Sequence, residues 1–191
     1  MNLNLTFPTG ILTHQVEDKV SNYIESIIVP RLKNLENANK YSIDNVSTDF
    51  FKDTKIINKK ELLPLTKEVT KCVEYYANEV SEPVGNYEYW VQDYNKYQFH
   101  GKHNHGRSTL FSVVYFVRAS DNAGNLVLEE SNPLKELWFQ TKSISSPCKN
   151  SSLHVKPKKG FLVVFPGYLP HHALPSETDC IRTIISYNFF G

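Results

Sequence analysis

The sequence predicts an α+β fold that is mainly β, in which two helices precede one β-rich block. In the first third, apolar residues recur at the three- and four-residue spacing of a helix face. From about residue 87, short runs of β-branched and aromatic residues follow, bounded by Gly, Pro, Asn or Ser. No Gly- or Ser-rich linker separates these parts. Residues 1–191 therefore read as a single domain, with 1–82 as mostly helical support and 87–191 as the β core.

Residues 14–37 and 59–80 read as the two helices. The first contains Pro30, which we expect to kink or split it. The polar stretch 37–55 between them reads as a loop. The two apolar stripes face the core and consist of Val16, Val20, Tyr23, Ile24, Ile27 and Ile28, and of Leu65, Val69, Cys72, Val73 and Tyr76.

Seven short runs read as strands, at the spacing of a sandwich or barrel. Many of them are apolar on both faces, which is typical of a buried sheet. The runs are 87–99, 109–117, 124–130, 135–140, 151–157, 161–166 and 180–190.

Composition and charge narrow the function classes. The chain has 21 Lys and Arg against 20 Asp and Glu, so its formal net charge is +1 and nothing favours nucleic acid or an anionic membrane as partner. No apolar run reaches the roughly 20 residues of a membrane span. The three cysteines, Cys72, Cys148 and Cys180, form no CxxC pair, and the N-terminal residues lack a secretory pattern, so we expect a cytoplasmic protein.

The stretch "FHGKHNHGRSTLFSVVYF" concentrates three of the seven histidines within six positions. If a regular strand runs through it, His103 and His105 project from the same face and His100 from the opposite face. A His-x-His pair of this kind can occupy two neighbouring positions around one divalent ion. A third ligand must then come from elsewhere in the fold.

The stretch "FLVVFPGYLPHHALP" offers that ligand, with His171 favoured over the adjacent His172. Arg182 follows 11 residues after His171, on an apolar strand where an unpaired charge is costly. Its guanidinium suits a bound organic acid, because it can grip a carboxylate with two hydrogen bonds. These residues alone leave two readings open, a metal site with open positions or histidines that serve packing and surface roles.

Three segments resemble the 2-oxoglutarate and Fe(II)-dependent oxygenases, in particular a small group common in phages and marine bacteria. They are "NVSTDFF", "WVQDYNKYQFHGKHNHGRSTLFSVVYFV" and "FLVVFPGYLPHHALPSETDCIRTIISYNF". The resemblance covers nearly the whole chain. It implies a double-stranded β-helix, a jelly roll of the cupin type, with supporting N-terminal helices.

The resemblance also implies the site. His103, His105 and His171 fall on the Fe(II) ligands, and Arg182 falls on the anchor for the distal carboxylate of 2-oxoglutarate. His105 stands where most of these oxygenases have Asp or Glu, so three neutral imidazoles would hold the metal.

Further contacts to 2-oxoglutarate are expected from other residues. Ile184 stands where many relatives place a Ser, so Tyr115 or Ser112 is expected to supply a hydroxyl, although their parity prevents both from pointing inward. Ser186 and Asn188 share the face of Arg182 and are expected beside the cofactor.

The implied activity is that of a dioxygenase that couples decarboxylation of 2-oxoglutarate to oxidation of a substrate. Hydroxylation of a prolyl or other peptidyl side chain is expected, with a small molecule as the other substrate class. Two rivals are a three-histidine cupin-type metalloenzyme without 2-oxoglutarate and a non-catalytic jelly-roll binding module. We expect no nucleic-acid or membrane partner, a dimer as one option for the oligomeric state, and the host cytoplasm if a virus encodes the chain.

Overall fold

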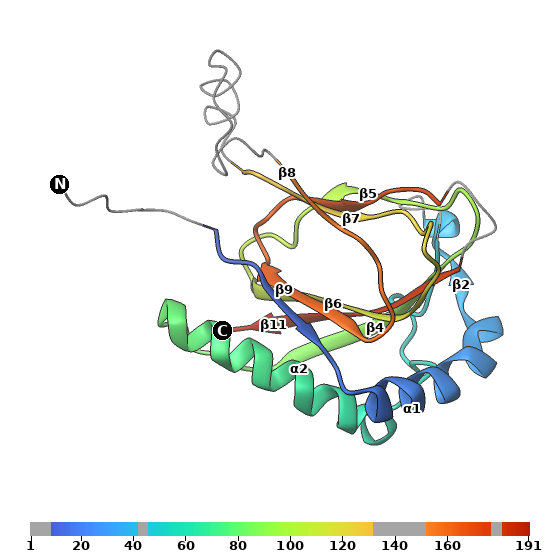
Figure 1. Ribbon diagram of the computed structural model, residues 1–191, viewed down its shortest axis with the longest axis horizontal. Coiled ribbons are helices and arrows are strands. Elements are labelled where there is room, and N and C mark those ends of the chain that lie inside the picture. Colours follow the sequence, from blue (N-terminus) through green and yellow to red (C-terminus); the bar gives the residue numbers. More distant parts are fainter. Residues whose placement is uncertain (1–8, 42–45, 132–151, 177–180) are drawn as a thin grey trace, which may run out of the picture.

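The computed structural model describes residues 9–41, 46–131, 152–176 and 181–191. Its described part has three layers: a pair of helices, a large antiparallel sheet and a smaller antiparallel sheet (Figure 1). The helices cover one face of the large sheet, and the small sheet faces the other. This is the predicted jelly roll with N-terminal helical support.

The helices begin and end close to the predicted positions. Helix α1 spans Asp18–Ile28, and a 3-10 helix η1, Val29–Asn34, continues from it with Pro30 in its first turn, so the expected split at Pro30 is confirmed. Helix α2 spans Lys59–Val80, as predicted, and begins with a capping box formed by Asn58 and Glu61. The polar stretch between them contains a short 3-10 helix η2, Ala38–Tyr41.

The large sheet has the order β1-β9-β6-β11-β4-β3-β2 and the small sheet the order β5-β10-β7-β8. Strands of the large sheet are β1 Leu12–Gln15, β2 Glu36–Asn37, β3 Ser47–Thr48, β4 Tyr87–Tyr94, β6 Thr109–Ala119, β9 Phe161–Pro166 and β11 Arg182–Phe190. Strands of the small sheet are β5 His100–His103, β7 Leu126–Glu129, β8 Ser152–Val155 and β10 His171–Ala173.

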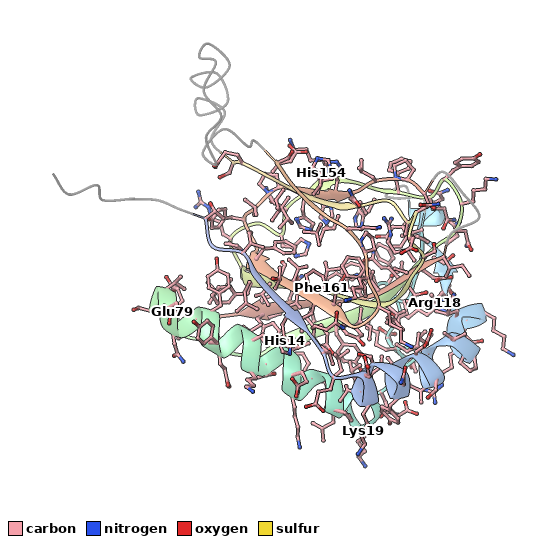
Figure 2. All side chains as sticks on the ribbon, viewed as in Figure 1. His14, Lys19, Glu79, Arg118, His154 and Phe161 are labelled. Carbon is pink, nitrogen blue, oxygen red and sulfur yellow. The ribbon has the colours of Figure 1, made fainter. Side chains whose placement is uncertain are left out.

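Alternation along the central strands creates two cores, one on each face of the large sheet. Odd-numbered residues of β6 and β11, such as Val113 and Tyr187, pack against α1 and α2. Even-numbered residues of the same strands, such as Val114 and Ile184, face the small sheet. Because both faces are covered, these strands read as apolar throughout, as predicted. Side chains fill the spaces on both sides of the large sheet (Figure 2).

The structure corrects the predicted elements in several places. Glu36 and Asn37 form β2 rather than the end of the first helix, and the predicted loop contains β3. His14 and Gln15 belong to β1, which pairs with β9, rather than to the first helix. The run 87–99 is strand only as far as Tyr94. Strand β10 was not foreseen, because three residues are too few to show a pattern. The expected strand at 135–140, together with Cys148 and Cys180, lies outside the described residues. Among the described residues, no helix has the length and apolar character that crossing a membrane requires.

Candidate metal and cosubstrate site

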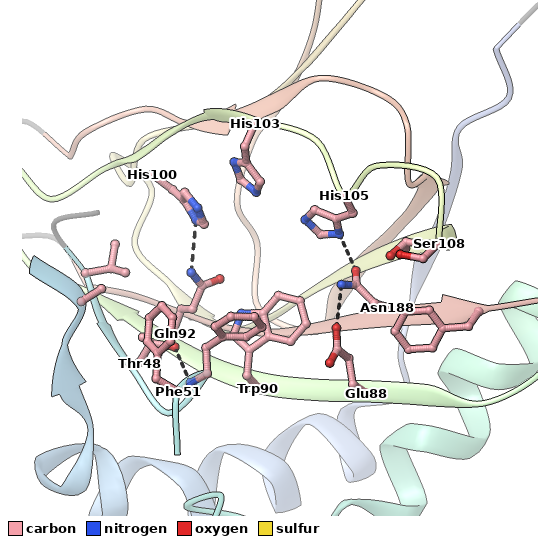
Figure 3. A pocket seen from close by; sticks show the side chains of 15 residues that line it. Thr48, Phe51, Glu88, Trp90, Gln92, His100, His103, His105, Ser108 and Asn188 are labelled. Atoms are coloured by element: carbon pink, nitrogen blue, oxygen red, sulfur yellow. Dashed lines mark hydrogen bonds between the residues drawn. The ribbon is translucent and has the colours of Figure 1, made fainter. Parts of the chain in front are cut away.

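Three histidines meet between the two sheets. His103 ends β5, His105 follows in the next turn, and His171 begins β10, directly paired with His103. One ligand atom from each of the three lies within 4.8 Å of the other two. His103 and His105 extend into the same space from one edge of the site (Figure 3). The predicted ligand set is therefore brought together by strand pairing, in the arrangement that a single metal ion needs.

Each of these imidazoles is oriented through its Nδ1 atom. Nδ1 of His103 lies 2.7 Å from the carbonyl oxygen of Gly101, and Nδ1 of His171 lies 2.9 Å from that of Leu169. A carbonyl oxygen only accepts, so both Nδ1 atoms carry the hydrogen and Nε2 is the coordinating atom. Metal-binding histidines are commonly fixed in this way.

His105 is held by a longer chain of polar side chains. Its Nδ1 lies 2.5 Å from Oδ1 of Asn188 and 2.8 Å from Oγ of Ser112. Nδ2 of Asn188 donates to Oε1 of Glu88 at 3.0 Å (Figure 3). Because the Glu88 carboxylate can only accept, it fixes which way the Asn188 amide points, and that amide in turn places the hydrogen of His105 on Nδ1.

The site favours neutral imidazoles. Burial lowers the pKa of His105, and the neighbouring His100 lowers it further. Burial also lowers the pKa of His171 well below its ordinary value, with His103 adding to the effect. Metal ions bind the neutral imidazole, so these shifts remove competition from protons at neutral pH. The donor set fits a divalent transition metal.

His100 lies beside the ligands rather than on the opposite face, so the parity prediction for it is wrong. Its ring stacks on that of His103, with centroids 4.0 Å apart and planes 13° from parallel. The cause is a bulge, because His103 pairs with His171 while His100 pairs with Ala173, which sets three steps of β5 against two of β10.

His100 also differs from the ligands in its tautomer. Gln92 accepts from Oγ of Ser186 at 3.2 Å through Oε1, so its amide nitrogen donates to Nδ1 of His100 at 3.1 Å. An accepting Nδ1 places the hydrogen of His100 on Nε2. His100 therefore presents a donor, where the other three histidines present a ligand atom.

Arg182 begins β11, pairs with Tyr94 on β4 and is only 2% exposed. Its Nη1 donates to the carbonyl oxygens of Gly124 and Leu174, the latter at 3.0 Å, and its guanidinium lies 4.0 Å from the ring centroid of Tyr94. Within the part of the chain that the structure describes, Nε and Nη2 have no hydrogen-bond partner. Two unpaired donors on a buried charge fit a bound carboxylate, which agrees with the predicted cosubstrate anchor.

The remaining predicted cofactor residues divide between the two faces of the large sheet. Ser112, Ser186 and Asn188 lie on the face of the histidines. Tyr115 instead lies in the core between the large sheet and the helices, so its expected contact with the cofactor is wrong. Strand β6 is regular here, and the even-numbered Ser112 takes the inward position. Asn188 was expected to contact the cofactor, but its side-chain oxygen is hydrogen-bonded to His105.

Two spaces adjoin the histidines. A small one, about 30 Å³, extends from His103 and His171 towards Ile184 and Tyr94, whose ring contacts Arg182. A larger one, about 320 Å³, opens on the other side of the histidines. Aromatic rings of Phe50, Phe51 and Trp90 form part of its wall, and Glu88 also lines it. The larger space has room for part of a substrate, whereas the smaller one has room for only a water molecule or two.

Sequence reasoning missed Glu88 and Gln92 at this site. Both share the parity of Trp90 and Tyr94 on β4, so their common face could have been found once that strand was assigned. The role of Phe50 and Phe51 depends on Asp49, whose buried carboxylate accepts from the backbone N–H groups of Val91 and Ile56 and so ties this segment to β4. No local pattern signals that long-range contact.

Comparison with known proteins agrees with this site. The family described as "Putative 2OG-Fe(II) oxygenase" matches residues 88–188, which include all three ligand histidines and Arg182. A search of curated proteins finds no match.

Solved structures share the fold at low sequence identity. A prolyl-4-hydroxylase from Pseudomonas putida aligns with a TM-score of 0.70 and 13% identity, over 95% of this chain and 92% of that one. A viral collagen prolyl hydroxylase from Paramecium Bursaria Chlorella virus-1 gives 0.58 and 14%, over 94% of each chain. HygX from Streptomyces hygroscopicus, solved with nickel, 2-oxoglutarate and hygromycin B, gives 0.62 and 14%, over 95% and 83%.

Proposed function

The chain belongs to the 2OG-Fe(II) oxygenase family, and from that premise we propose that it hydroxylates an aliphatic carbon of a prolyl or other peptidyl side chain. One observation supports the assignment of roles above all others. A cluster of three histidines lies between a substrate-sized cavity and a buried arginine with two donors that have no partner among the described residues.

The chain's own residues divide the work. His103, His105 and His171 would hold the iron, while Nε and Nη2 of Arg182 would grip the distal carboxylate of 2-oxoglutarate. When bound, Fe(II) and 2-oxoglutarate would supply the oxidising chemistry with O2 as the oxidant, one oxygen atom going to succinate as 2-oxoglutarate loses carbon dioxide and the other to the substrate. Phe165 packs against the edge of the His171 ring, with centroids 4.8 Å apart, and helps to exclude water there.

A peptidyl side chain is the proposed substrate. The prolyl hydroxylases of similar fold motivate the substrate class, although their identity of 13–14% supports only the fold. The larger cavity is partly open and edged by exposed Phe50 and Phe51, which suits a substrate that extends beyond it. We keep a cytoplasmic location and a dimeric state as proposals, with phage origin as a third.

The test is coupled turnover. Purified protein with Fe(II), 2-oxoglutarate and oxygen should release succinate slowly alone and faster with a peptide substrate, whose mass should increase by one oxygen atom. A three-histidine metalloenzyme that does not use 2-oxoglutarate would release no succinate. Succinate release that no peptide accelerates would instead point to a small-molecule substrate.

A further inference from the structure

Every second side chain of strand β4 faces the histidines, and these side chains are in turn acidic, aromatic, amide and aromatic. Glu88, Trp90, Gln92 and Tyr94 all face the small sheet, and Tyr94 pairs with Arg182 across the strands. At about 3.3 Å per residue, the distance from Glu88 to Tyr94 is about 20 Å. This row of side chains therefore has a negative charge at its Glu88 end and, beside Tyr94, the positive charge of Arg182 at the other end. His105 and His100 lie beside its middle, next to Trp90 and Gln92.

This polarity separates the two ligands. The positive end at Arg182 suits the dianionic cosubstrate. The other end is the 320 Å³ cavity, where Glu88 is, among the described lining residues, the only one besides the histidines that can carry a formal charge. An anionic substrate would meet a carboxylate there, whereas a cationic one would be attracted to it.

One oxygen of the Glu88 carboxylate is committed to a hydrogen bond within the protein. Oε1 accepts from Asn188, and the residue as a whole is exposed at the cavity wall. A single amide group separates this carboxylate from the imidazole of His105. A substrate whose cationic group pairs with Glu88 would therefore have the carbons of the same side chain close to the histidines.

The aromatic wall favours the same kind of ligand. Phe50 contacts Phe51 and Trp90 edge to face, with centroids 4.9 Å apart in both pairs. Aromatic rings of this kind accept methylene groups and attract organic cations. The nearby Lys55 ammonium lies 5.9 Å from the Phe50 centroid, is held by the carbonyl oxygens of Asp49 and Phe50, and does not line the cavity.

We propose that the substrate cavity selects an aliphatic chain ending in an ammonium or guanidinium group, such as a lysyl or arginyl side chain, with Glu88 as its counter-ion. This inference rests on the proposed function and specifies its substrate class. It makes Glu88 a specificity residue in addition to its role in orienting Asn188.

The test uses matched peptides and calorimetry. Five acetylated, amidated tripeptides differ only at the central residue, which is Lys, Arg, norleucine, Gln or Glu. Each is titrated anaerobically into protein mixed with Fe(II) and 2-oxoglutarate. The variants are Glu88→Gln, which keeps an oxygen that can accept from Asn188, and Glu79→Gln, which removes a charge from the exposed end of α2 (Figure 2), at a residue that does not line the cavity.

We expect the Lys or Arg peptide to bind at least about tenfold more tightly than the norleucine and Gln peptides, with the Glu peptide weakest. Glu88→Gln should remove this preference, and Glu79→Gln should retain it. Equal binding of Lys and norleucine peptides, no binding by any peptide, or a preference that survives in Glu88→Gln would each overturn the inference. Calorimetry needs no turnover, so it judges the cavity even if succinate release fails, and that failure would count against the proposed function alone.

Discussion

Replacement of Arg182 by Lys or Met tests the cosubstrate assignment most sharply. The guanidinium is buried, and two of its nitrogens lack partners. A hydrogen bond to a charged group contributes about 1.5–3 kcal/mol. Two such bonds to a carboxylate total about 3–6 kcal/mol, so Arg182→Met should weaken 2-oxoglutarate binding by about 10²–10⁴-fold. Lys keeps the charge but cannot make two parallel hydrogen bonds to one carboxylate, so Arg182→Lys should weaken 2-oxoglutarate binding by about 10–10²-fold.

The assay is anaerobic titration of 2-oxoglutarate into protein with Fe(II) bound, with iron affinity measured separately. Iron binding should persist in both variants because Arg182 is not a ligand. Arg118→Lys is a matched control, since Arg118 also lies on the large sheet but its guanidinium already donates to Thr183 and Asp93. Unchanged 2-oxoglutarate affinity in Arg182→Met, or an equal loss in the control, would refute the reasoning.

Further predictions concern the metal site and its support. His171→Ala should abolish stoichiometric Fe(II) binding, while His100→Ala should retain it, because His100 presents a hydrogen on Nε2; the reverse result in metal titrations would show that the ligand set is wrong. Asn188→Ala should weaken iron binding by about 10–100-fold through loss of the orienting contact to His105, measured by competition with a chelator, and unchanged affinity would contradict that role. Metal-free protein should lose stability as the pH falls below about 6.5. His105 and His171 have lowered pKa values in the folded chain, so at this pH the unfolded chain binds protons more readily than the folded chain does. Thermal unfolding at pH 7.5 and 5.5 checks this, and His171→Gln should flatten the profile; equal melting temperatures of the unmodified chain would count against it. Gly167→Ala should cost about 1–3 kcal/mol in urea unfolding, because its Cβ would lie 2.3 Å from a backbone oxygen beside the turn into His171, and unaltered stability would show that the turn adapts.

The sequence carried most of the architecture because the central strands obey simple alternation. The helix at 59–80 and the regular strands around Ser112 and Ser186 follow from apolar periodicity. Parity failed at His100, where a bulge adds a residue to β5. A bulge is set by the pairing partner, which a single strand does not reveal.

Local sequence patterns also could not show which face of the large sheet holds the site. Tyr115 and Ser112 are both plausible from their chemistry, and parity shows only that they are opposed. The packing of α1 and α2 places Tyr115 on the wrong side. The chain from Glu88 through Asn188 to His105 likewise joins residues that are 100 and 83 positions apart, so it emerges only when β4, β11 and the turn after β5 are assembled.

The central claim is that one iron and one 2-oxoglutarate bind together between the histidines and Arg182. Anaerobic addition of Fe(II) and then 2-oxoglutarate to the purified chain measures this directly, through the visible charge-transfer absorption of the complex. We predict that the band develops and saturates at one equivalent of each, and that Arg182→Met requires far more 2-oxoglutarate to reach it. Bound iron that gives no band at any 2-oxoglutarate concentration would contradict the account.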